Sequence, residues 1–109
     1  MMRDIVFILG NSTRNAAERS KYADAETVIM NLGHGVLTSA WLPDGIEREA
    51  CTRIDFALID AVDVVVALPG WEDSADAQQA MRYAMERKKT VAQYNKFVSS
   101  ELKKLAKSQ

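Results

Sequence analysis

The sequence has few of the residues that build disulfide or zinc scaffolds. It contains one cysteine, Cys51, and one histidine, His34, among 109 residues. A single cysteine cannot form a disulfide within the chain, and one cysteine with one histidine falls short of the four ligands of a structural zinc site. We therefore expect no metal site. We interpret Cys51 as a small core residue and His34 as a turn residue.

Net charge and long apolar runs are also lacking. The formal net charge is −1, so no overall field attracts nucleic acid or an anionic membrane. No apolar run reaches the roughly 20 residues of a membrane span, and no signal peptide precedes the first predicted strand. We expect a cytoplasmic protein without a membrane or nucleic-acid partner.

The five glycines do not form a cofactor-binding motif. The loop at 10–13, Gly-Asn-Ser-Thr, follows an apolar run but lacks the spaced glycines of a dinucleotide fingerprint and the lysine of a P-loop. We predict no cofactor. The same loop is small, polar and turn-prone, so its backbone can approach a ligand closely.

One stretch organises the rest of the chain. An unbroken apolar run at 64–68 is typical of a strand buried on both faces. Pro69 and Gly70 end this run, and Ser74 follows as a predicted N-cap before an alanine- and methionine-rich helix. A strand, a loop and a helix in this order place ligands at the carboxyl edge of an open α/β sheet, where we predict the functional site.

Strands and helices alternate along one domain that we predict to span residues 1–109. Strands are predicted at 5–9, 35–41, 64–68 and 90–94, and helices at 16–32, 46–61, 74–88 and 99–107. This alternation predicts an α/β fold of three layers, α-β-α, with a mostly parallel four- to five-stranded sheet in the order 2-1-3-4. The fold is of the flavodoxin or Rossmann-like type, with the loops at 10–15 and 69–74 facing each other across one cleft.

Helical spacing predicts which side chains face the sheet. The predicted inner positions are Ala50, Cys51, Ile54, Leu58 and Ala61 or Val62 in the second helix, Ala77, Ala80, Met81, Ala84 and Met85 in the third, and Leu102 and Leu105 in the last. Asp55 borders the stripe of the second helix. It is either a solvated flank or a carboxyl that points into the site.

Four motifs resemble the nucleoside 2-deoxyribosyltransferase-like superfamily. They are the first strand ending at Gly10, Leu-Gly-His-Gly-Val at 32–36, Arg-Ile-Asp at 53–55, and Asp-Val-Val-Val-Ala-Leu-Pro-Gly-Trp-Glu-Asp-Ser at 63–74. The resemblance covers about residues 5–91. It is closer to a short bacterial and phage branch whose members have no established function.

The resemblance implies a reaction at a sugar carbon, and this sequence departs from the residues that the reaction uses. In active members a glutamate on the third helix attacks the anomeric carbon of the sugar and displaces the base. In nucleotide-hydrolysing relatives a serine six residues earlier holds the 5′-phosphate at the helix N-terminus. By this resemblance Ser74 matches the phosphate-binding serine, Asp55 matches the acid near the base, and the nucleophile position falls on Ala80. Asp76, where the branch commonly has glycine, adds negative charge near any bound phosphate.

The predicted site follows from these matches. The expected ligand-binding residues are Gly10, Asn11, Ser12, Asp55, Gly70, Trp71 and Ser74. No residue is assigned to catalysis outright, and Asp55 and Glu72 are the only candidates. Trp71 is either a platform for a base or an anchor for its loop. Glu72 is either a replacement nucleophile or a solvated residue in the turn before the helix.

Three functions are compatible with these residues, so whether the protein is an enzyme stays open. The first is a catalytically degenerate protein that binds a nucleoside, a nucleotide or a similar small molecule. The second is an active N-glycosidase or deoxyribosyltransferase that uses a different acid. The third is a phage or prophage module that binds a host protein through Trp41, Trp71 and Phe97 as exposed anchors. The resemblance also implies a homodimer or a larger homo-oligomer.

Overall fold

The computed structural model describes residues 4–11, 16–43 and 45–107. Its elements, in chain order, are β1 (Ile5–Leu9), α1 (Ala16–Asn31), β2 (Gly35–Leu37), α2 (Arg48–Ala61), β3 (Val64–Ala67), the short 3₁₀ helix η1 (Trp71–Asp73), α3 (Ala75–Glu86), β4 (Thr90–Gln93) and α4 (Tyr94–Lys107). No helix within these ranges is both long and apolar enough to cross a membrane.

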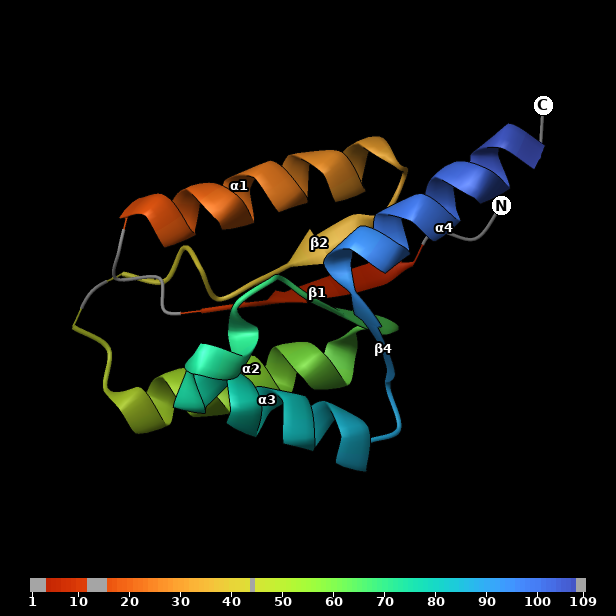
Figure 1. Ribbon diagram of the computed structural model, residues 1–109. Coiled ribbons are helices and arrows are strands. Elements are labelled where there is room, and N and C mark those ends of the chain that lie inside the picture. The colour runs from red at the N-terminus through yellow and green to blue at the C-terminus, as the bar shows by residue number, and fades with distance from the viewer. Residues whose placement is uncertain (1–3, 12–15, 44, 108–109) are drawn as a thin grey trace.

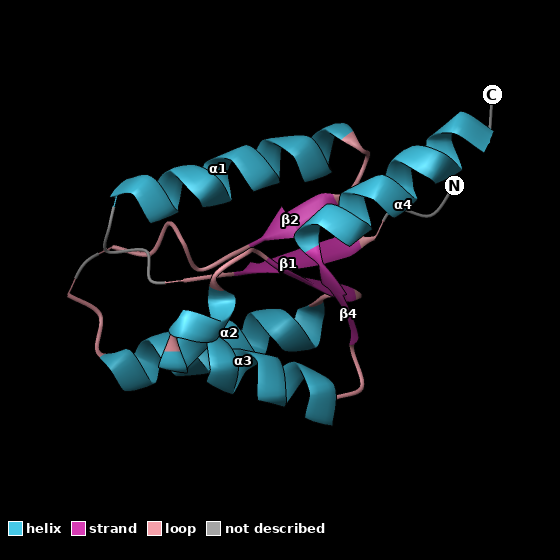
Figure 2. Ribbon diagram, viewed as in Figure 1, coloured by secondary structure: helices cyan, strands magenta, loops and turns pink. Residues whose placement is uncertain are grey.

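The described strands form one parallel sheet in the order β2-β1-β3-β4. Helices α1 and α4 cover one face of this sheet, and α2 and α3 cover the other (Figure 1). The predicted three-layer α/β fold and strand order are therefore confirmed, with four strands in the described part of the chain. The loops that follow β1 and β2 leave the sheet on the side away from the two chain termini (Figure 2).

Each central strand contributes side chains to both layers of the core. Along β1, Val6 and Ile8 pack with α1, whereas Phe7 and Leu9 pack with α2 and α3. The neighbouring strand β3 is buried throughout. Successive side chains of a strand point to opposite faces, so a strand covered on both faces must be apolar at every position. This requirement explains the two unbroken apolar runs.

Strand β2 ends sooner than predicted, at Leu37 instead of residue 41. The Thr38 hydroxyl donates to the carbonyl of Ile8 at 3.4 Å and accepts the backbone N–H of Ala40 at 3.2 Å. A side chain that bonds nearby backbone groups offers an alternative to the strand ladder. The segment after Thr38 is therefore free to turn toward the carboxyl edge of the sheet.

The predicted inner faces of α2 and α3 need correction. Ile59, which the predicted stripe omitted, is fully buried, and of the alternatives Ala61 and Val62 it is Val62 that is buried. Met85 was predicted to face the core but is 65% exposed. Helix α2 packs against both the sheet and α3, so its buried surface follows two neighbours rather than one stripe.

The C-terminal helix differs most from the prediction. It begins at Tyr94, directly after β4, instead of at residue 99. The earlier start turns Phe97 and Glu101 inward, while Leu102 and Leu105 are exposed. The helix also extends past the edge of the sheet (Figure 1), so its last turns have no strand beneath them. Phe97 is therefore not an exposed anchor for a partner.

Candidate functional site

A cavity lies at the carboxyl edge of the sheet, beside the ends of β1 and the start of α3. Its volume is about 200 Å³. The end of β1, the loop after β2, the first turns of α2 and the first turns of α3 provide its walls. Drug-sized pockets start at about 300 Å³, so this cavity suits a small ligand.

Four of the predicted site residues meet in this cavity. Gly10, Asn11, Asp55 and Ser74 all line it. The structure thus places Asp55 on the cavity wall, which decides between the two interpretations of its position. Ser12 lies outside the described residues.

Gly70, Trp71 and Glu72 do not line this cavity, contrary to their predicted place in the site. The reason is the backbone of Gly70, whose φ of +92° turns the chain into η1. Trp71 then packs against the core layer formed by α2 and α3. Glu72 is exposed, and its backbone carbonyl accepts a hydrogen bond from the side chain of Gln78. In this structure Trp71 anchors its loop, and Glu72 is a solvated residue before the helix.

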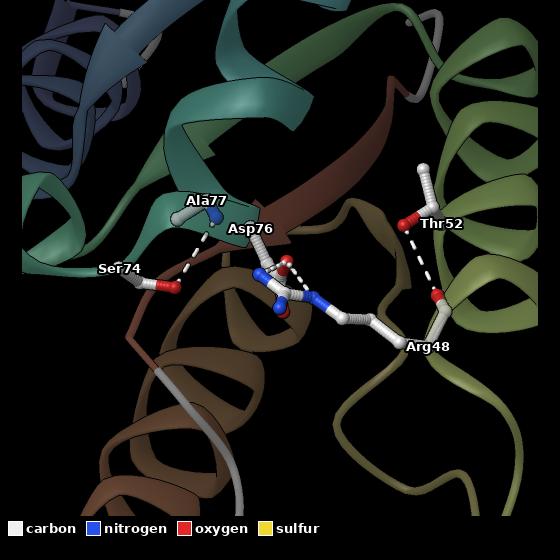
Figure 3. Close-up of polar contacts among 5 residues, drawn as sticks. All are labelled: Arg48, Thr52, Ser74, Asp76 and Ala77. Atoms are coloured by element: carbon white, nitrogen blue, oxygen red, sulfur yellow. Dashed lines mark hydrogen bonds and ion pairs between the residues drawn. The ribbon is translucent and has the colours of Figure 1, made fainter.

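Ser74 caps helix α3 as predicted. Its hydroxyl oxygen accepts the backbone N–H of Ala77 at 3.2 Å (Figure 3). Residues three apart share a helix face, so Ala77 and Ala80 both line the cavity. Ala80 is only 3% exposed. The cavity therefore has a methyl group at position 80, which the resemblance to the nucleoside 2-deoxyribosyltransferase-like superfamily matches to the nucleophile.

The Asp55 carboxyl is the most perturbed acid of the cavity. Burial raises its pKa, the nearby Asp76 carboxylate raises it further, and a hydrogen bond with the Ser39 side chain opposes the shift. Its Oδ1 atom is buried and has no hydrogen-bond partner among the described residues. A buried polar atom without a partner costs stability and is a feature of functional sites. Asp55 is thus placed to exchange a hydrogen bond with a ligand.

Tyr22, which is not among the predicted site residues, also lines the cavity. Its hydroxyl donates to the backbone carbonyl of Asn11 at 3.1 Å. Burial, and secondarily the Asp55 carboxylate, raise the pKa of this phenol, so it stays neutral. A β-carbon at Gly10 would lie 3.0 Å from the Tyr22 hydroxyl, which explains the glycine. The available signal was that a buried tyrosine needs a partner for its hydroxyl.

Arg48 is a second cavity residue that sequence reasoning missed. Its Nη2 and Nε atoms donate to Oδ1 of Asp76 at 2.8 and 3.0 Å (Figure 3). Both side chains are more than half exposed. A cation in the first turn of a helix is disfavoured by the helix dipole. Its unusual place at the start of α2 was therefore a signal available in the sequence.

Comparison with known proteins assigns a family. A family described as "Domain of unknown function (DUF4406)" matches residues 5–93. The chain belongs to this family. No curated protein matches the sequence. Among solved structures, the Clostridium botulinum CMP N-glycosidase BcmB has a similar fold, with a TM-score of 0.63 and 19% identity over 82% of this chain and 69% of that one.

The DUF4406 chain has another polar cluster, at the opposite, amino edge of the sheet. Ligand atoms of Asp4, His34 and Glu101 lie within 4.8 Å of one another, a grouping that a divalent cation could use. However, Nε2 of His34 and Oε1 of Glu101 form a direct contact of 2.7 Å. Glu101 is buried, and its contact with His34 connects α4 to the residue just before β2. A structural role in holding these two elements together therefore accounts for the pair. We assign no metal to it.

Several polar groups line the cavity of the DUF4406 chain. They are the Tyr22 hydroxyl, the Asp55 carboxyl and the exposed Arg48–Asp76 pair. Each of these groups can form hydrogen bonds with a small ligand.

Proposed function

We propose that this protein binds a nucleoside or nucleotide-like small molecule in the cavity at the carboxyl edge and does not cleave it by the glutamate chemistry of the superfamily. The carrying observation is that Ala80, buried on the cavity wall, has no carboxylate. The shared fold with an enzyme named for acting on CMP supports the choice of ligand class.

The superfamily chemistry needs a carboxylate close to the reacting carbon, and residue 80 does not provide one. A nucleophile must lie about 3–3.5 Å from the reacting carbon and in line with the leaving group. A methyl group cannot form the glycosyl-enzyme ester, and Glu72 is exposed and outside the cavity. Of the two candidate acids, Asp55 is the one that lines the cavity, so it is the residue that the alternative, an active N-glycosidase, would use.

Membership of a phage branch, assembly into homo-oligomers and binding of a host protein are further proposals. Of the three suggested anchors, Trp41 is 54% exposed, Trp71 is half-buried and Phe97 is 9% exposed. The Trp41 indole N–H donates to Oε2 of Glu26 at 2.9 Å. A single exposed tryptophan supports this function less well than the cavity supports ligand binding.

The test is calorimetric titration of a panel of nucleosides and their 5′-monophosphates, with chromatography for released base. We expect saturable binding to the wild-type protein and no free base. Asp55→Asn should weaken binding about tenfold, the order expected for losing one well-placed polar contact in a buried site. Glu72→Gln is the matched control and should bind like wild type. No saturable binding up to millimolar ligand would contradict the proposal, and base release lost in Asp55→Asn would establish the alternative.

A further inference from the structure

The first turn of α3 already holds a carboxylate inside the cavity. Asp76 is the second residue of this helix and lines the cavity together with Arg48. The two guanidinium contacts to its Oδ1 hold the carboxylate near the helix N-terminus (Figure 3). Helix N-termini attract negative charge. The N-terminus of α3 therefore already has a negative charge beside it, the Asp76 carboxylate.

Some polar groups around that position already have partners. The Ser74 hydroxyl oxygen accepts from the Ala77 N–H at 3.2 Å, and the Ser74 carbonyl accepts from the Gln78 N–H at 3.0 Å. Nε and Nη2 of Arg48 donate to Asp76, so a phosphate that used these two donors would have to displace that carboxylate. The displaced carboxylate would stay on the same helix turn, within the cavity.

The charges of the cavity add to this effect. Among the described residues that line it, the cationic side chain is Arg48, and the carboxyls are Asp55 and Asp76. Arg48 is already paired with Asp76, so an incoming dianion would meet the Asp76 carboxylate and no unpaired cation from these residues. Like charges at contact distance repel even when solvent screens them.

We infer that Asp76, held by Arg48, makes the cavity select a ligand whose sugar ends in a neutral hydroxyl over one that ends in a phosphate. The Asp76 carboxylate accepts a hydrogen bond from that hydroxyl, which a phosphate cannot donate. This inference rests on the proposed function and names its ligand class as nucleosides. Asp76 is a specificity-determining residue.

The test compares each nucleoside with its 5′-monophosphate by calorimetry on wild type, Asp76→Asn and Asp73→Asn. Wild type should bind the nucleoside at least about tenfold more tightly than the monophosphate, and Asp76→Asn should remove or reverse this preference. Asp73→Asn removes the same charge from η1, which is exposed and lies outside the cavity, so the preference for the nucleoside should remain. Higher salt should narrow the wild-type preference, because screening weakens charge repulsion.

Each outcome separates the two proposals. Tighter binding of the monophosphate by wild type, or a preference unchanged in Asp76→Asn, overturns this inference and leaves the proposed function standing. Equal loss of preference in Asp73→Asn also overturns it, since general surface charge would then be the cause. Absence of binding of both ligands overturns the proposed function and this inference together.

Discussion

Helix α2 carries two aspartates in opposite surroundings. Asp55 lies on the cavity wall, where burial raises its pKa and Oδ1 lacks a partner among the described residues. Asp60, near the other end of the helix, is surrounded by donors: the Tyr83 hydroxyl at 2.8 Å and the Arg87 Nε at 2.9 Å. These donors lower its pKa. The middle of α2 thus presents an incompletely bonded carboxyl to the cavity, whereas its C-terminal end is bonded to α3.

The same contrast extends to the two edges of the sheet. At the amino edge, polar groups join elements that are distant in sequence: His34 bonds Glu101, and the Lys89 ammonium donates to the backbone carbonyls of Asp60 and Val62. At the carboxyl edge, the Arg48–Asp76 pair is exposed to solvent and Asp55 is incompletely bonded. Each edge also has one buried polar atom without a hydrogen-bond partner among the described residues, Nδ1 of His34 and Oδ1 of Asp55. The amino edge thus joins distant elements, whereas the carboxyl edge holds the cavity that we propose for binding.

The largest expected effect is at the amino edge. His34→Ala removes the ring nitrogen that lies 2.7 Å from Oε1 of the buried Glu101, and losing a hydrogen bond to a carboxyl in such a place costs about 2–3 kcal/mol of unfolding free energy. Urea denaturation measures the loss. Lys104→Ala removes an exposed partner of the same carboxylate and should change stability by less than about 0.5 kcal/mol. Ligand binding should survive both substitutions, and its loss in folded His34→Ala protein would contradict the separation of the two edges.

Gly10→Ala should have the next largest effect. The new methyl would lie 3.0 Å from the Tyr22 hydroxyl and 3.2 Å from Cδ1 of Leu68, both buried, and such overpacking costs about 1–2 kcal/mol. Calorimetry should also show weaker ligand binding, because Tyr22 must shift. In a Tyr22→Phe background the same substitution should cost less, since the hydroxyl that it meets is gone. Equal costs in both backgrounds would contradict this explanation.

Tyr22→Phe alone should have a smaller effect. It removes the hydrogen bond to the Asn11 carbonyl and should cost about 1 kcal/mol in denaturant unfolding. Ligand affinity should fall as well, because the hydroxyl lines the cavity. Tyr94→Phe is a control outside this cavity, in which affinity should not change. Unchanged affinity in Tyr22→Phe would remove the tyrosine from the site.

The smallest expected effect is the pH dependence of stability to which Asp55 and Asp60 contribute. The folded pKa of Asp55 lies above its ordinary value of 3.8, so its contribution is most favourable below that value and is lost as pH rises. Asp55→Asn should therefore gain stability relative to wild type as pH rises above about 4. The folded pKa of Asp60 lies below its ordinary value, so its contribution is present above about 4 and is lost as pH falls. Unfolding midpoints of wild type, Asp55→Asn and Asp60→Asn across this range should diverge in opposite directions, and parallel curves would contradict the contrast.

Local patterns were sufficient for much of the fold. The apolar runs of β1 and β3, and Ser74 before α3, predicted two interior strands and a capped helix because each depends on neighbours in sequence. The start of α4 could not be predicted in this way. No glycine or proline separates β4 from Tyr94, and β4 ends where its pairing with β3 ends.

The candidate site, like the fold, could be predicted from the sequence only in part. The sequence by itself determined the alternation of strands and helices, the cap at Ser74, the alanine at residue 80 and the expectation of a cavity at the carboxyl edge. Only the tertiary structure decided that Tyr22 and Arg48 join the cavity while Trp71 and Glu72 stay outside it. The physical reason is that periodicity fixes which face of an element is apolar, whereas a cavity is made where ends of several elements converge. That convergence depends on packing between residues far apart in the chain.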